Sequence, residues 1–302
     1  MQRWNIAHAR HLLGVFRQGR YPAAAVYDSL GADFFLAPAP GWLNLGLWEG
    51  PGDLDEALIA PRRLVETLAN ALPADAAILD VANGLGAQDL VIAEVARPRR
   101  LIALNLTESQ LRAGRERLRA AGALPVVADA GRIPLARASV DGVICVEAAF
   151  HFRSRAEFFA EARRVLRPGG VLVTSDISAE RGPRRFDELI AGLATLRVWG
   201  LRRDALASAA QIGRQAESAG FADVKVSRCA ERVFDPALNW VSARLDQLER
   251  AGAVPRSQMA VARLTAGHWR LLRERGLMDY LLLRASVPES TSTVRATSRA
   301  RG

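Results

Sequence analysis

The stretch Ile78-Leu-Asp-Val-Ala-Asn-Gly-Leu-Gly86 decides the expected fold. It begins as a short apolar run, continues into small residues, and is followed by a helix-like segment over residues 88–96. A strand that ends in a glycine-rich turn before a helix lets a ligand approach the backbone at the carboxyl edge of a sheet. No Gly-Lys-Ser/Thr follows, and the third glycine of the dinucleotide fingerprint is missing. Asp80 precedes the turn, where a carboxylate suits a cationic ligand better than a pyrophosphate. The stretch therefore predicts a nucleotide-type site that is neither a P-loop nor a dinucleotide site.

The same alternation of short apolar runs and helical patterns continues along the chain. Strands are expected at residues 76–82, 101–105, 125–128, 142–146 and 171–175, with helices at 88–96, 108–120 and 155–166. Arg167-Pro-Gly-Gly170 is expected to form a turn before the fifth strand. Short apolar strands that alternate with helices indicate a parallel sheet covered by helices on both faces.

Composition excludes several classes of protein. The chain has 302 residues, 50% of them hydrophobic, and contains no internal repeat and no apolar run as long as a membrane span. Its two cysteines, Cys145 and Cys229, are too few for a disulfide scaffold or a zinc cluster, and we expect no metal site. The N-terminus lacks a signal-peptide pattern. We therefore expect a soluble, cytoplasmic globular protein.

The charge is unusual but scattered. The formal net charge is +9, and Lys225 is the only lysine among the 41 basic residues. The arginines form small groups spread over the sequence, which favours a coding bias over a surface for polyanions. We expect a small-molecule partner, neither nucleic acid nor a membrane, and we leave a homodimer open.

Polar residues follow three further strands. Asn105 ends the second strand 25 residues after Asp80, where an acidic residue would bind ribose hydroxyls. Asp129 follows the third apolar run, and Glu147 ends the fourth. Because the carboxyl ends of parallel strands share one edge of the sheet, we expect these side chains to surround the same ligand.

In this order the motifs resemble the class I S-adenosylmethionine-dependent methyltransferases over about residues 40 to 230. The family's first motif is an acidic residue followed by alternating glycines, and Asp80 to Gly86 matches it with Ala82 at the first glycine. Alanine suits that position only if its φ is negative. The resemblance implies a Rossmann-like, seven-stranded, mostly parallel sheet with an antiparallel last strand and helical cap elements.

The resemblance also implies a site for S-adenosylmethionine. Gly84 and Gly86 would line the methionine moiety, Asn105 stands at the acidic ribose position, and Asp129 with Ala130 would hold the adenine. The full expected cofactor site also contains Asp80, Ala82, Asn83, Gln88, Leu106, Gln110, Glu147 and Tyr27, the last of these lying over the cofactor.

A finer resemblance points to a subgroup. The aromatic turn Trp42-Leu-Asn-Leu-Gly-Leu-Trp48 and the stretch Glu147 to Arg155 are similar to small-molecule methyltransferases of natural-product pathways, including those that methylate hydroxyls of macrolide sugars. We expect transfer to a hydroxyl oxygen. Carbon or nitrogen methylation of an isoprenoid or polyketide, or cofactor binding without catalysis, stays open. A nucleic-acid methyltransferase is disfavoured because no Asn/Asp-Pro-Pro-Tyr/Phe tetrapeptide is present.

His151 is the expected general base, since it follows the fourth strand beside the cofactor site and a base with a pKa near 6–7 accelerates proton transfer by roughly 10²–10⁴. Glu147 would contact the cofactor or orient His151. The alternative for His151 is a structural role between its phenylalanine neighbours. Five aromatic residues could build an apolar substrate wall or simply pack in the core: Trp42, Trp48, Phe150, Phe152 and Trp199.

The expected organisation has five parts. A helical cap over residues 1–72 precedes the cofactor-binding core over 73–180, and lid helices follow over 181–210. Residues 211–286 complete the sheet with strands at 222–227 and 278–284, and a helical insertion over 230–276 forms more of the lid or an oligomer contact. Residues 287–302 have the composition of a disordered tail.

Overall fold

A computed structural model describes residues 41–201, 206–252 and 255–289, and its centre is one seven-stranded sheet of order β3-β2-β1-β4-β5-β7-β6. Only β7 runs antiparallel to its neighbours. The strands are β1 (Ala77–Val81), β2 (Arg100–Asn105), β3 (Ala123–Val127), β4 (Val140–Val146), β5 (Leu166–Ala179), β6 (Ala222–Arg228) and β7 (Met278–Ser286). This arrangement confirms the expected fold class.

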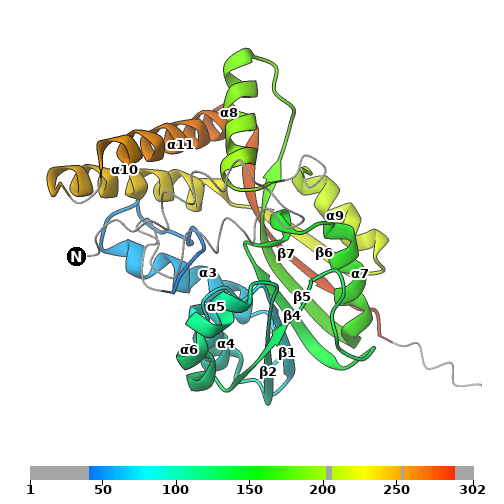
Figure 1. Ribbon diagram of the computed structural model, residues 1–302. Helices are drawn as coiled ribbons and strands as arrows, with labels where there is room; N and C mark the ends of the chain where they lie inside the picture. The colour runs from blue at the N-terminus through cyan, green and yellow to red at the C-terminus, as the bar shows by residue number, and fades with distance from the viewer. Residues whose placement is uncertain (1–40, 202–205, 253–254, 290–302) are drawn as a thin grey trace, which may run out of the picture.

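Helices cover both faces of the sheet (Figure 1), and a hydrophobic core lies under each layer of helices. One face is covered by α3 (Ala60–Ala69), α4 (Ala87–Ala96), α5 (Glu108–Ala113) and α6 (Arg115–Ala120), the other by α7 (Arg155–Val165) and α9 (Ala209–Ser218). In β1, Leu79 packs into one core and Ile78 into the other, and the whole strand is buried. A strand buried on both faces reads as a continuous apolar run, as the sequence does here.

The helix expected over residues 108–120 is broken at Gly114. A Cβ at this glycine would lie 2.6 Å from the backbone oxygen of Leu85. The break therefore allows the two short helices to pack closely against the glycine-rich turn after β1.

The turn expected at residues 167–170 is wrong, because these residues belong to β5. The pairing of β4 with β5 jumps from Val140–Leu166 to Gly142–Val171, and Gly169 has a φ of +74° at this irregularity. The strand also runs on to Ala179, since its second half pairs with the whole of β7. Pairing with a distant strand thus extends β5 beyond what its own sequence indicates.

The insertion between β6 and β7 is helical, as expected. After a short 3₁₀ helix, η4 (Ala230–Arg232), it consists of α10 (Phe234–Arg250) and α11 (Arg256–Glu274). Figure 1 shows these two helices side by side, with α8 (Phe186–Val198) standing upright beside the end of α11. Ala191 of α8 packs against Leu272 and Leu277, which places the expected lid helix and the insertion in one helical layer.

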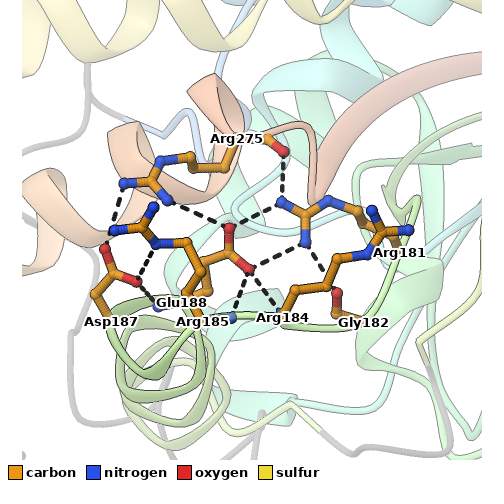
Figure 2. A network of polar contacts seen from close by, with 7 residues as sticks. All are labelled: Arg181, Gly182, Arg184, Arg185, Asp187, Glu188 and Arg275. Carbon is orange, nitrogen blue, oxygen red and sulfur yellow. Dashed lines mark hydrogen bonds and ion pairs between the residues drawn. The ribbon is translucent and has the colours of Figure 1, made fainter.

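A polar network attaches α8 to the end of α11 (Figure 2). The Glu188 carboxylate, only 1% exposed, accepts hydrogen bonds from the Arg181 guanidinium at 2.8 and 3.0 Å and from the Arg184 backbone N–H at 2.8 Å. Arg275 lies 3.5 Å from the same carboxylate, and its carbonyl accepts a hydrogen bond from Arg181. Hydrogen bonding to Arg181 lowers the pKa of Glu188 to about 2. The network therefore fixes the loop before α8 in one position.

The ends of the described chain differ in part from the expectations. Within the described part of the expected helical cap, residues 41–72, the helices are η1 (Glu56–Leu58) and α3. Val287, expected in the tail, is 2% exposed and donates its N–H to the Gly170 carbonyl, so it belongs to the core. Tyr27 and the first part of the expected cap lie outside the described residues. In the part of the chain that the structure describes, no helix combines the length and apolar character needed to cross a bilayer.

Candidate active site

A cavity opens at the carboxyl ends of β1, β2 and β4 and beyond the end of β3, the edge of a parallel sheet at which ligands commonly bind. Ten of the residues expected in the site line it: Ala82, Gly84, Asn105, Leu106, Gln110, Asp129, Ala130, Glu147, His151 and Phe152. The fold thus brings together side chains from four strand ends. Nine further lining residues carry no signal that identified them in the sequence: Leu43, Asn44, Val81, Leu104, Thr107, Ala128, Val146, Ala148 and Arg153.

Four other expected cofactor residues, namely Asp80, Asn83, Gly86 and Gln88, do not line the cavity. The Asp80 carboxylate is fully buried and accepts hydrogen bonds of 2.7 and 2.8 Å from the Gln88 amide. The Asn83 amide donates to Asp89 at 2.8 Å, and this second carboxylate is fully buried as well. The expectation that Asp80 meets a cationic ligand is therefore wrong, because its partners lie within the protein, beneath the turn.

The two buried carboxylates cannot both ionise easily. Burial, followed by the charge of Asp89, raises the pKa of Asp80 well above its usual range. Burial raises the pKa of Asp89 itself to about 7. Asp89 was missed because an acidic residue in the first turn of a helix ordinarily serves the helix dipole. The pair forms a supporting layer under the glycine-rich turn.

The turn itself is left-handed at three positions. The φ angles are +62° at Ala82, +59° at Gly84 and +83° at Gly86. Ala82 therefore does not have the negative φ that suits alanine. A hydrogen bond of 2.7 Å from the Ala82 N–H to the Leu104 carbonyl holds the residue in this conformation. Gly86 serves packing, since a Cβ there would lie 3.3 Å from the Gly114 oxygen.

We expect Ala82→Gly to stabilise the protein by about 0.5–1 kcal/mol. The substitution removes the strain energy of an alanine in the left-handed conformation, and this gain exceeds the larger loss of backbone entropy when a glycine folds. Chemical denaturation of both proteins measures the difference. The matched control is Ala93→Gly within α4, which should destabilise by about 1 kcal/mol. A loss of stability in Ala82→Gly would contradict the strain assigned to this position.

Asn105 has its amide committed to neighbouring groups. Its Nδ2 donates to Gln110 Oε1 at 2.9 Å and to the Gly84 carbonyl at 3.3 Å, and its Oδ1 accepts from the Thr107 N–H at 3.0 Å. The position that the family fills with an acid is thus part of a neutral amide pair with Gln110. Asp129 also lines the cavity, with its Oδ1 accepting the Gly131 N–H at 2.8 Å.

The catalytic candidates Glu147 and His151 both line the cavity, but Glu147 hydrogen bonds elsewhere. Its Oε2 accepts from the Leu45 N–H at 3.0 Å and from the Tyr280 hydroxyl at 2.8 Å. Burial raises the pKa of Glu147 to about 8. The His151 ring packs on Phe150 with centroids 4.1 Å apart, and burial lowers its pKa to about 3. His151 is therefore neutral and less basic than a general base near pKa 6–7 would be.

An ion pair holds the loop that carries His151, which is the short 3₁₀ helix η2 (Ala149–His151). Asp176, in the second half of β5, accepts from the Phe150 N–H at 3.1 Å and from Arg155 Nε at 2.7 Å. The side chains of the pair are 0% and 3% exposed. This role of Asp176 was not predicted, although Asp176 follows the strand expected at residues 171–175 in the same way that Glu147 follows the strand expected at 142–146.

The expected aromatic wall is reduced to Phe152, which lines the cavity and packs on Phe158. Trp48 is 1% exposed in a core cluster with Trp240, and Trp199 packs on Trp269 with centroids 5.3 Å apart. Trp42 packs against the core on the α3 side, and Phe150 also lies outside the cavity lining. For these four residues the structure favours packing over contact with a substrate.

Comparison with known proteins agrees with this geometry. A family model described as a methyltransferase domain matches residues 79–174. Erythromycin 3''-O-methyltransferase of Saccharopolyspora erythraea is 29% identical over 237 residues, which cover 72% of this chain and 74% of that protein. The 27-O-demethylrifamycin SV methyltransferase of Amycolatopsis mediterranei is 27% identical over 82% of this chain and 90% of its own. The solved structure of the cyclopropane synthase MmaA2 from Mycobacterium tuberculosis shares the fold, with a TM-score of 0.70 at 17% identity over 89% of this chain and 99% of that one.

The cavity fits the cofactor of such enzymes. S-adenosylmethionine presents a flat base, ribose hydroxyls and a positive sulfonium, which need apolar walls, polar edges and negative charge. Ala128 and Ala130 supply an apolar wall, Asn105 an amide edge, and Asp129 a carboxylate, with the Glu147 carboxyl beside them. Gly84 keeps the turn open, since a Cβ there would lie 3.3 Å from Leu43 on the cavity wall. The chain is a class I S-adenosylmethionine-dependent methyltransferase.

Proposed function

We propose that this enzyme transfers a methyl group to a hydroxyl oxygen of a small-molecule natural product. The observation that carries the proposal is the presence of a carboxyl group able to accept a proton, Glu147, beside a neutral imidazole, His151, in the wall of the cofactor cavity. A hydroxyl must lose its proton to become a good nucleophile, whereas a neutral amine needs no such help. Two relatives named as methyltransferases of erythromycin and 27-O-demethylrifamycin SV support an oxygen-rich acceptor of this type.

The bound cofactor supplies an electrophilic methyl group on a sulfonium. Asn105, Asp129 and Gly84 would hold it at the sheet edge, and Phe152 with Leu43 would exclude water. Alignment of two reactants in such a dry site lowers the barrier by up to about 7–11 kcal/mol. The neutral His151 imidazole would accept a hydrogen bond from the acceptor hydroxyl and so orient it.

The proposal keeps the remaining expectations on partners. The partner is the small-molecule acceptor, and the enzyme acts in the cytoplasm. Nucleic acid is not a partner, since the arginines are spread in small groups along the sequence. A homodimer in which α10 and α11 form the contact remains part of the proposal, to be tested by light scattering.

The test is transfer of a ¹³C-methyl group from labelled S-adenosylmethionine to a panel containing 27-O-demethylrifamycin SV and other hydroxylated macrolides. The ¹³C chemical shift of the product identifies the methylated atom. Label on oxygen supports the proposal. Label on carbon or nitrogen favours the corresponding alternative, and cofactor binding without transfer to any acceptor favours a non-catalytic binding protein.

A further inference from the structure

Glu147 has a strained backbone at the edge of the cavity. Its φ is +50°, a left-handed conformation that is unfavourable for a residue with a side chain. The strain is maintained because the Glu147 N–H donates to the Ser175 hydroxyl at 3.0 Å and to the Ser175 carbonyl at 3.1 Å on β5. Strained residues of this kind gather at active sites, where the surrounding structure holds a side chain in a set direction.

The side chain of Glu147 is held at one of its two oxygens. Oε2 accepts both of its hydrogen bonds, one from the Leu45 N–H before α3 and one from the Tyr280 hydroxyl on β7. Tyr280 is 0% exposed and packs edge-on against Phe234, so its hydroxyl has a fixed position. In the described part of the chain Oε1 has no hydrogen-bond partner, and the residue lines the cavity. The carboxylate is thus oriented with one oxygen left for a ligand.

We propose that Glu147 Oε1 accepts the proton of the acceptor hydroxyl and that Tyr280 is a positioning residue that holds this carboxylate through Oε2. The inference rests on the proposed transfer to oxygen. The proton moves from the acceptor oxygen to Oε1, the electron pair of the broken O–H bond forms the new bond to the methyl carbon, and the electrons of the carbon–sulfur bond stay with sulfur.

The basicities of the two candidate groups favour Glu147 over His151. With a pKa of about 3, His151 is too weak a base to take a proton at neutral pH. The pKa of Glu147 is raised to about 8 by burial and by the charge of Asp176, while the Leu45 N–H and the Tyr280 hydroxyl lower it. A cationic ligand in the cavity lowers the pKa of a neighbouring carboxyl, which brings Glu147 toward the working pH. The other titratable or charged groups in the described cavity wall are Asp129, His151 and Arg153, and Asp176 on β5 and Tyr280 on β7 act on the same carboxyl.

Tyr280→Phe tests the positioning role, since it removes only the hydroxyl that donates to Oε2. Loss of one hydrogen bond to the ionised form should raise the pKa of Glu147 by about one unit. A ¹³C NMR titration of the free enzyme with labelled glutamate carboxyls measures this shift, and the Glu147 signal is identified by its absence in Glu147→Gln. In the loaded enzyme kcat should fall about tenfold at pH 7, with an unchanged KM for the cofactor, and the acidic limb of the pH–rate profile should move upward by the same unit.

Thr174→Val is the matched control, because it removes another buried hydroxyl of the sheet, one whose hydrogen bond goes to the Ser175 carbonyl. Thr174→Val should change neither the pKa of Glu147 in the NMR titration nor the pH–rate profile. If Tyr280→Phe moves neither while the product still carries an O-methyl group, the positioning role is wrong and the proposed function stands. An O-methylating Glu147→Gln enzyme with the wild-type rate would overturn the assignment of Oε1. A product methylated on carbon or nitrogen would instead remove the proposed function on which the inference rests.

Discussion

Asp176→Asn is expected to lower the free energy of unfolding by about 3–5 kcal/mol, because it leaves the buried Arg155 guanidinium without its counter-charge. Arg155 is 4% exposed, and the two side chains meet at 2.7 Å between the second half of β5 and the start of α7. Asparagine keeps the shape of the side chain and an oxygen that accepts the Phe150 N–H. The loss of stability therefore reports the removal of the negative charge alone. Guanidinium chloride denaturation measures it.

Two controls make this prediction specific. The double variant Arg155→Met with Asp176→Leu should recover most of the lost stability, since a buried ion pair replaced by apolar groups is often neutral or better. Glu108→Gln breaks the exposed pair with Arg112, whose side chains are 76% and 58% exposed, and should change stability by no more than about 0.5 kcal/mol. A loss below about 1 kcal/mol in Asp176→Asn would show that the pair is open to water.

Glu147→Gln is expected to lower kcat by roughly 10²–10⁴ while the protein remains folded, because glutamine accepts the same two hydrogen bonds but cannot take a proton. The matched control is Glu161→Gln, which neutralises a half-buried carboxylate outside the cavity that accepts hydrogen bonds from Arg164 and from the Ile133 N–H. Steady-state kinetics of both variants should separate them clearly. Equal rates would mean that the carboxylate of Glu147 takes no part in the reaction.

The same substitution has a second, thermodynamic signature. The pKa of Glu147 in the folded chain, about 8, lies above the ordinary glutamate value of 4.5, so the folded state holds a proton that the unfolded state releases. Its contribution to stability is therefore complete below pH 4.5 and is lost as the pH rises through 8. In that window the wild type should lose stability relative to Glu147→Gln by at most about 1.4 kcal/mol per pH unit. Denaturation of both proteins across this pH range measures the difference.

The parts of the site that the sequence predicts are those set by local pattern and by sheet geometry. Ala82, Asn105, Asp129 and Glu147 each follow an apolar run, and parallel strands place such ends at one edge. No further information is needed to bring these residues around one cavity. The same argument explains why the overall fold could be predicted from the alternation of strands and helices.

The direction of a side chain on a fully buried strand could not be predicted in this way. All five residues of β1 are buried, so the pattern does not distinguish one face from the other or the cavity from the core. Asp80 consequently lies under the turn and interacts there with Gln88 and Asp89 of α4. The sequence of α4 contains no signal that predicts this contact. The φ of Ala82 is fixed by a hydrogen bond to β2 and is equally invisible in the local sequence.

Contacts between distant segments account for the remaining omissions. Tyr280 reaches Glu147 across 133 positions of sequence because β7 inserts antiparallel between β5 and β6. The role of the aromatic residues could not be predicted for a related reason. Trp48 and Trp199 are residue types that also line binding sites, but in the fold they pack against other side chains in the core. Sequence pattern identifies an apolar side chain, and the packed fold decides what it covers.

Above all, the edge of the sheet at β1, β2 and β3 is expected to bind S-adenosylmethionine. Calorimetric titration of S-adenosylmethionine and S-adenosylhomocysteine into wild type, Asp129→Ala and Asp246→Ala tests it most directly, with folding verified by thermal unfolding. Asp246 is a matched control because it lies on α10, exposed and outside the cavity. The account predicts dissociation constants on the order of micromolar for wild type and Asp246→Ala, and a loss of about tenfold in Asp129→Ala. No binding of either ligand to the folded wild type, or equal binding by all three proteins, would contradict it.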